Sequence, residues 1–107
     1  MTVNIKRLAQ GQLPLTQTTL YPAPDNTETI INTIRCVNTH TADITMNLYV
    51  RVTGSSARRI IPKNMTLKAG YLLVVDDEQN LEASDRLQGD ASTADKVDYI
   101  ISGMEKS

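Results

Sequence analysis

Few side chains in this sequence are of the kinds that carry out chemistry. The chain has one histidine, His40, so it cannot assemble a histidine-based metal triad, and a Ser-His-Asp relay would depend on this one residue, which lies in a polar turn. The single cysteine, Cys36, cannot form an internal disulfide, and its place between Ile34 and Val37 predicts a small buried hydrophobic residue. We therefore expect no catalytic residues and no cofactor.

An acidic segment is the next candidate for chemistry. Asp76, Asp77 and Glu78, together with Asp85 or Asp90, could offer oxygen ligands to a calcium ion. The ligand spacing of a calcium-binding loop is missing, however, and acidic turns between strands are common. Paired carboxylates for glycoside hydrolysis would need a sugar cleft that a small domain hardly provides. We expect no metal site and no enzyme; a small cupin-like metalloenzyme is disfavoured by the single histidine.

The bulk properties limit the partners of the chain. The formal net charge is −1 over 107 residues, and no basic stripe is present, which argues against nucleic acid or an anionic membrane as a partner. Residues 1–9 carry charged and polar side chains where a signal peptide would need an apolar core. We therefore expect synthesis in the cytoplasm.

Period-two alternation is the clearest structural pattern. Within residues 44–52 the apolar positions are Ile44, Met46, Leu48, Val50 and Val52, and polar or amphipathic residues stand between them. Side chains on a strand point to opposite faces in turn, so this segment predicts a strand that covers a core on one side. The abundance of Thr, Ile and Val also favours strands. With four tyrosines and no Phe or Trp, the core is expected to be thin and aliphatic.

The remaining segments predict further short strands. Residues 1–17 predict one strand followed by a loop or an extended arm, and residues 18–107 the main domain. Residues 18–21 end at two prolines, and residues 27–38 place Ile30, Ile34 and Cys36 on one face. Residues 38–41 are expected to form a hairpin loop leading into the strand that covers residues 43–52.

The second half of the sequence continues the pattern. Strands are expected at residues 58–61 and 65–67, and residues 71–75 predict a short buried strand because they form a continuous apolar run. Residues 81–91 predict two strands split near Ser84 and Asp85, and residues 97–104 the last one, with Val97, Tyr99 and Ile101 facing one way. About eight short strands without a helix indicate an all-β, antiparallel β-sandwich of jelly-roll-like type.

Seven residues are candidates for contacts with other proteins. Arg58, Arg59 and Lys63 form a local basic cluster, and arginine suits interfaces because its planar fork binds carboxylates, although a solvated strand edge is the alternative. Tyrosine gives a large contact area at low entropic cost. The predicted interface set is Ile5, Arg7, Tyr49, Arg58, Arg59, Lys63 and Tyr71.

The sequence also resembles a group of small virion proteins of tailed bacteriophages. The resemblance runs over nearly the whole chain. The proteins of this group usually have Gly where Ser84 stands and a small apolar residue where Cys36 stands. The segments that carry it are Lys6–Ala9, Thr18–Pro24, Ile30-Ile31 with Ile34-Arg35, Val37–Thr39, Asn47–Val50, Arg58–Asn64, Leu81–Asp85 and Asp98–Glu105.

This resemblance implies a structural component of the virion. The expected role is that of a capsid decoration (cement) protein, which binds the major capsid protein or other virion proteins as a small homo-oligomer, with a trimer favoured. Residues 1–17 could then pair with a neighbour by strand addition. A tail, baseplate or fibre-associated module that binds host glycans through exposed tyrosines is the alternative.

Overall fold

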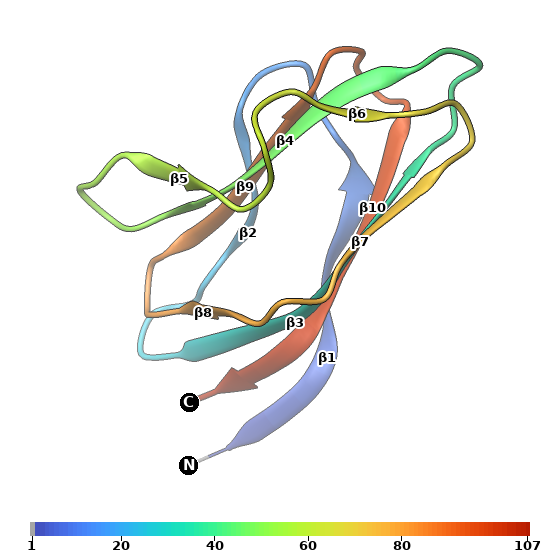
Figure 1. Ribbon diagram of the computed structural model, residues 1–107. Coiled ribbons are helices and arrows are strands. Elements are labelled where there is room, and N and C mark those ends of the chain that lie inside the picture. The colour runs from blue at the N-terminus through green and yellow to red at the C-terminus, as the bar shows by residue number, and fades with distance from the viewer. Residues whose placement is uncertain (1) are drawn as a thin grey trace.

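The computed structural model describes residues 2–107, which form strands and connecting loops with no helix among them (Figure 1). None of the described segments is therefore a helix able to cross a membrane. The strands are β1 (Val3–Gln12), β2 (Thr18–Pro22), β3 (Glu28–Asn38), β4 (Ile44–Arg51), β5 (Ala57–Arg59), β6 (Met65–Leu67), β7 (Leu72–Val75), β8 (Gln79–Leu81), β9 (Arg86–Ala91) and β10 (Val97–Lys106).

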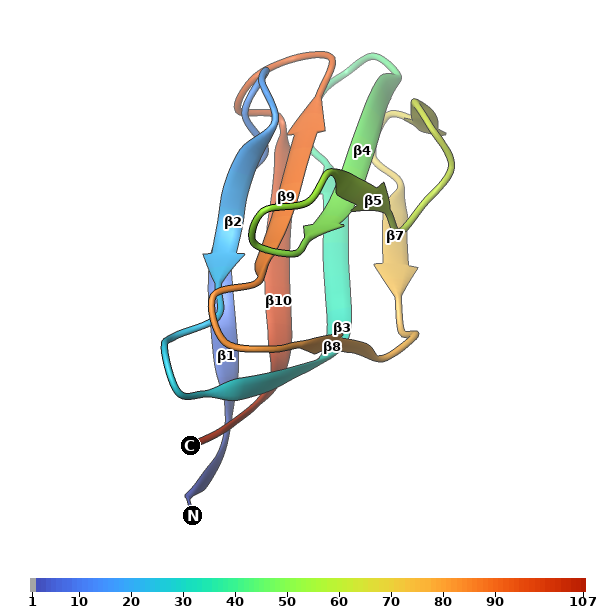
Figure 2. The same ribbon diagram turned by 90° about the vertical axis from the view of Figure 1, so that its left-hand side faces the viewer.

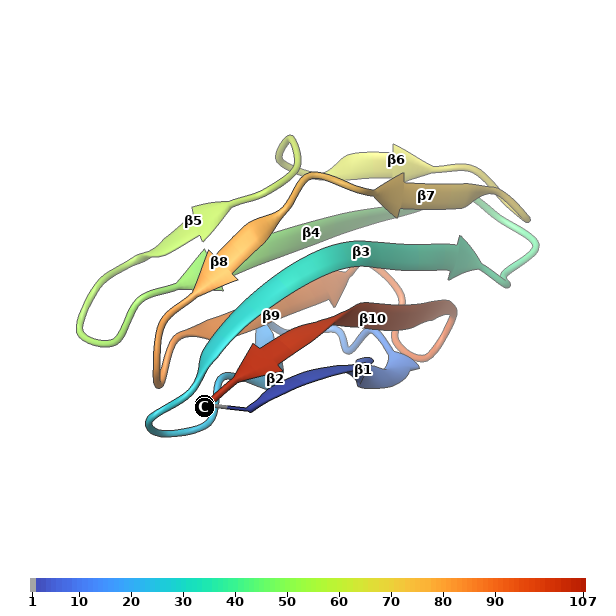
Figure 3. The ribbon, with the colours of Figure 1, turned by 90° about the horizontal axis from the view of Figure 1, so that it is seen from below.

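Two antiparallel sheets pack face to face. The first sheet has the order β1-β10-β3-β7, with β8 also paired to β3, and the second has the order β2-β9-β4-β5, with β6 also paired to β4. Figure 2 shows β2, β9 and β4 in front of β1, β10 and β3, and Figure 3 shows β1 and β2 along the same side of the sandwich. The predicted all-β antiparallel sandwich is confirmed.

The path of the chain between the sheets is that of a jelly roll. The chain alternates between the two sheets through β1, β2, β3 and β4, stays in the second sheet for β5 and β6, and returns to the first for β7 and β8. Strand β9 then inserts between β2 and β4, and β10 inserts between β1 and β3. The pairs β5/β6 and β7/β8 each occupy one edge of a sheet. Ten strands therefore fill eight positions, because Pro62 interrupts one outer strand and Asp76–Glu78 the other.

The core between the sheets is mainly aliphatic, as the composition predicts, and includes the rings of Tyr21 and Tyr99. Ile44, Met46 and Leu48 of β4 are almost fully buried, so the predicted parity of this strand is correct. Val52 lies beyond the end of β4 and is 49% exposed, so the alternation ends before it. On β10, Val97, Tyr99 and Ile101 point inward as predicted.

The predicted parity of β3 is wrong in its first half. Ile31, and not Ile30, is buried together with Ile34 and Cys36. The register between β3 and β10 shifts where Ile31 and Thr33 face consecutive residues of β10, which leaves Asn32 as the extra residue of a β-bulge. A bulge reverses the alternation, so residues on the two sides of Asn32 follow opposite parity.

The predicted hairpin at residues 38–41 is also wrong, because β3 and β4 belong to different sheets. The connection is an arch held by the fully buried Asn38. Its amide nitrogen donates to the carbonyl oxygens of Ala42 (3.0 Å) and Leu67 (2.9 Å), and its side-chain oxygen accepts the backbone N–H of His40 (2.9 Å). A buried polar side chain with all these partners fixes the crossing from one sheet to the other.

The predicted buried strand at residues 71–75 is an edge strand of the first sheet. Leu72 and Val74 of β7 are 46% and 44% exposed, whereas Leu73 and Val75 pack against the core. An apolar run does not reveal whether both faces of its strand are covered. The predicted break near Ser84 and Asp85 is present, but β8 ends at Leu81, so Glu82 and Ala83 lie in the connection to β9 and not in a strand.

Candidate interaction surfaces

The predicted interface residues lie on opposite faces of the sandwich. Ile5 and Arg7 stand on the outer face of the first sheet, where they are paired with Met104 and Ser102 of β10. Tyr49 points out of the second sheet, because its neighbours in the strand, Leu48 and Val50, face the core. Ile5 and Arg7 therefore lie on a different surface from Tyr49.

The outer face of the first sheet carries exposed apolar side chains. Their exposed fractions run from 42% for Ile100 to 83% for Ile5. We call this surface the apolar face, and its members are Val3, Ile5, Leu72, Val74 and Ile100. Tyr71 precedes β7, is 61% exposed, and has the ammonium group of Lys68 5.9 Å from its ring centroid. The side chains of the apolar face are spread over β1, β10 and β7, and Arg7 and Arg35 stand on the same face.

The outer face of the second sheet carries a connected polar cluster around Asn47. The amide nitrogen of Asn47 donates to Asp90 (2.9 Å) and to the side chain of Asn64 (3.1 Å). The Asn47 oxygen accepts bonds from Arg59 (2.6 Å) and from the backbone N–H of Asn64 (2.8 Å). The Tyr49 hydroxyl donates to Asp90 (2.8 Å). We call these five residues the Asn47 cluster.

The Asn47 cluster brings two of the predicted residues together. The guanidinium of Arg59 lies 5.1 Å from the ring centroid of Tyr49, which leaves Tyr49 only 7% exposed. Burial, and then the bond to Asp90, raise the pKa of Tyr49. Arg58 is paired with Val50 and so points to the opposite side from Arg59, as its adjacent position predicts. Lys63 is exposed in the loop between β5 and β6.

The sequence analysis missed Asn47, Asn64 and Asp90. Asn47 does stand at an outward position of the alternating strand, which is the signal available from sequence. Only the folded chain shows that Arg59 and the loop bearing Asn64 cover it, because these residues are distant from Asn47 in sequence.

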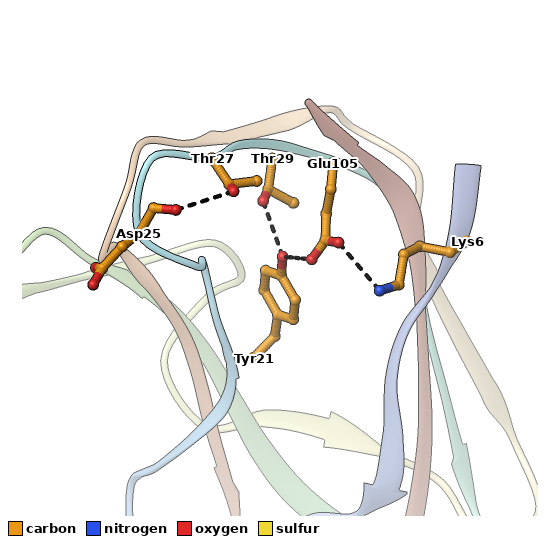
Figure 4. Close-up of polar contacts among 6 residues, drawn as sticks. All are labelled: Lys6, Tyr21, Asp25, Thr27, Thr29 and Glu105. Atoms are coloured by element: carbon orange, nitrogen blue, oxygen red, sulfur yellow. Dashed lines mark hydrogen bonds and ion pairs between the residues drawn. The ribbon is translucent and has the colours of Figure 1, made fainter. Parts of the chain in front are cut away.

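A second polar network closes the end of the sandwich near the two termini (Figure 4). The Tyr21 hydroxyl donates to Glu105 at 2.5 Å and lies 2.9 Å from the Thr29 hydroxyl, and Glu105 accepts a bond from Lys6 at 3.1 Å. These four residues come from β2, β10, β3 and β1. Nearby, the Thr27 hydroxyl donates to the backbone oxygen of Asp25 (3.2 Å). The network joins both sheets and the first strand.

The environment of the Tyr21 network shifts two pKa values in opposite directions. Burial, strengthened by the bond to Glu105, raises the pKa of Tyr21 to about 12. The hydrogen bond from Tyr21, followed by the contact with Lys6, lowers the pKa of Glu105 although partial burial opposes this. Burial is thus the main cause of the Tyr21 shift, whereas the bond from the neutral hydroxyl is the main cause of the Glu105 shift.

The other chemically capable side chains are dispersed. Cys36 is fully buried, as predicted, and burial raises its pKa to about 12, which disfavours the reactive thiolate. The Asp85 carboxylate accepts the backbone N–H of Glu82 (3.0 Å), and Asp90 belongs to the Asn47 cluster. Within residues 2–107, no three His, Cys, Asp or Glu side chains gather in a group that could hold a metal ion.

Comparison with known proteins supports the fold. Neither a protein-family model nor a curated protein sequence matches this chain. Among solved structures, the chain is similar to a chain in the structure of infectious bursal disease virus, Gx strain, with a TM-score of 0.56 and 16% sequence identity. The match covers 97% of this chain and 32% of the viral chain, so this protein spans about a third of the length of the chain it matches. At this identity the likeness concerns the fold, which is a jelly-roll β-sandwich.

Proposed function

We propose that this chain is a non-enzymatic structural protein of a virus particle. In the specific form of the proposal, it decorates the capsid of a tailed bacteriophage, binds the major capsid protein or another virion protein, and assembles as a small homo-oligomer, with a trimer as the expected form. The observation that carries the proposal is the jelly-roll path over the whole chain, shared with a chain of a virus structure.

The distribution of side chains supports a role in contacts. The apolar face offers exposed aliphatic groups on a sheet, which can bury area against another protein without first rearranging. The Asn47 cluster on the opposite face is held in one geometry by its own hydrogen bonds. A subunit with two structured faces can contact the lattice with one and present the other outward.

The role of residues 1–17 belongs to the same proposal. In the single chain, residues 3–12 pair with β10 as an outer strand of the first sheet. Outer strands have one edge without a partner in their own sheet, and such edges can pair with another chain through backbone hydrogen bonds.

Two measurements test the proposal. Sedimentation of the purified chain should give a small oligomer, and an electron-microscopy map of the particle should place the chain on the outside of the capsid. Ile100→Lys should keep the fold and reduce the occupancy of the particle, because a charge on the apolar face opposes burial there. Thr66→Lys, at the exposed position of β6 in the second sheet, is the matched control. A stable monomer that is absent from particles would contradict the proposal.

Binding of host glycans is the second candidate, and Tyr71 favours it. Its ring is 61% exposed and could stack on a sugar, whereas the ring of Tyr49 is covered by Arg59. Jelly rolls also include lectin domains, although a shared fold does not define function. Retention of glycans by the purified protein, lost in Tyr71→Ala, would favour this role over decoration.

A further inference from the structure

Strand β1 has ten residues and contributes little to the core of the sandwich. None of its side chains is buried, and only Leu8 and Ala9 are partly covered. By contrast, β10 beside it contributes Val97, Tyr99 and Ile101 to the core. Because burial of apolar side chains supplies most of the stability of a strand in a sandwich, β1 should open at a lower free energy than the rest of the fold.

The contacts that hold β1 are mainly polar. It forms an antiparallel ladder with β10 that reaches the end of the chain, where Thr2 and Ser107 exchange two backbone hydrogen bonds of 3.0 Å. Lys6 pairs with Glu105 (3.1 Å), and the Gln12 amide donates to Asp98 (3.0 Å). Strand β1 can form the same bonds equally well with β10 of another copy.

A firm anchor follows β1 directly. Leu13 is fully buried, its N–H donates to the carbonyl oxygen of Val97 (2.9 Å), and its own carbonyl accepts the N–H of Asp95 (3.2 Å). The carbonyl oxygen of Pro14 accepts the N–H of Ala91 (2.9 Å). The chain can therefore open up to Gly11 and Gln12 while residues from Leu13 onward stay in place.

The inner side of β1 matches one particular site on β10. Leu8 lies over Gly103, where an added methyl group would come within 3.0 Å of the Leu8 side chain. Gly11 lies against Tyr99, whose hydroxyl oxygen would be 3.1 Å from a methyl group added at Gly11. Together with the Lys6–Glu105 pair, these contacts make the strand position beside β10 specific for the β1 sequence.

We propose that β1 is exchanged between copies of this chain in the assembled oligomer. Residues 2–10 of one subunit leave their own sheet, pivot at Gly11 and Gln12, and pair with β10 of a neighbouring copy, whose own β1 is displaced in the same way. An extended segment of this length spans about 30 Å, so the pairing position on β10 of the neighbour must lie within that distance of the pivot. The inference rests on the homo-oligomer of the proposed function.

A disulfide across the β1–β10 pair tests the exchange. Gln10 faces Ile100 on the outer face of the first sheet, so Gln10→Cys with Ile100→Cys places two cysteines opposite each other, in a Cys36→Ala background. The control variant replaces Arg35 and Ile100 with cysteine, because Arg35 faces Ile100 from the other side on β3, which is not exchanged. Both variants are oxidised as oligomers and run on a non-reducing denaturing gel.

We expect the Gln10/Ile100 variant to give covalently linked chains and the control to give monomers with internal disulfides. An oligomer whose Gln10/Ile100 disulfides are all internal would overturn the exchange and leave the oligomer of the proposed function intact. A monomer in sedimentation would overturn both.

Hydrogen exchange on the unmodified protein gives an independent test that needs no cysteine variant. In dilute solution the amides of β1 should exchange at least tenfold faster than those of β3, and raising the protein concentration until oligomers form should slow them. Amides of β1 that are as protected as those of β3 at every concentration would overturn the exchange.

Discussion

Tyr21→Phe tests the physical account of the polar network at the end of the sandwich. The change removes one hydroxyl and keeps the ring, so the packing of the 5% exposed Tyr21 side chain is preserved. It removes the bond to the Glu105 carboxylate and the contact with Thr29. A hydrogen bond to a charged group contributes about 1.5–3 kcal/mol and a neutral one about 1 kcal/mol. Since Glu105 keeps its contact with Lys6 and some access to solvent, we expect the free energy of unfolding to fall by about 2–3 kcal/mol at pH 7.

The pH dependence of this loss separates the carboxylate bond from simple packing. The pKa of Glu105 is lowered in the folded protein, chiefly by Tyr21, from an ordinary value of 4.5. Its contribution to stability is therefore complete above pH 4.5 and disappears as the pH falls through the lower folded pKa. In Tyr21→Phe the pKa of Glu105 should rise, and the difference in stability from wild type should shrink below pH 4 (about the reference pKa of a carboxyl group).

Tyr21 itself gives stability the opposite pH dependence in alkaline solution. The pKa of Tyr21 is raised from 10.0 to about 12, so the stability linked to this group is present below pH 10 and is lost as the pH rises toward 12. Tyr21→Phe removes that component of the alkaline loss. Tyr49 and Tyr99, whose pKa values are also raised, should maintain the remainder.

Urea unfolding followed by circular dichroism at pH 3, 7 and 11 provides the measurement. Tyr49→Phe is the matched control, because it removes a hydroxyl bonded to a carboxylate on the outer face and leaves Glu105 untouched. The control should lose stability without changing the acid limb of the Glu105 titration. Equal losses for Tyr21→Phe at pH 3 and pH 7 would refute the role assigned to the carboxylate.

Three further substitutions test the core, the sheet contacts and the arch. Ile44→Asp should prevent folding, because it places an unpaired carboxylate in the core at a cost of several kcal/mol, and soluble protein with a native circular dichroism spectrum would contradict the parity of β4. Gly103→Ala should destabilise strongly, since its methyl group would overlap the Ile30 carbonyl oxygen, whereas Gly54→Ala, in open space with positive φ, should cost about 1 kcal/mol in thermal unfolding. Asn38→Ala should lower stability by about 2–5 kcal/mol in urea unfolding, because it leaves buried backbone groups unpaired, and a loss under 1 kcal/mol would exclude that explanation.

The sequence determined the features that depend on local alternation. The all-β class, the inward parity of β4 and β10, the split between β8 and β9, and the burial of Cys36 follow from short segments whose side-chain period is two. The β-sandwich also follows, because many short strands with regular turns have few ways to bury their apolar faces.

Only the tertiary structure decided which sheet each strand joins and which outward residues meet. The bulge at Asn32 reverses the parity of β3 through pairing with β10, which has no local signal. The arch at Asn38 and the covering of Asn47 by Arg59 and Asn64 likewise depend on partners far along the chain. Local sequence fixes the direction of a side chain relative to its own strand, whereas the identity of its neighbours is set by the closure of the two sheets.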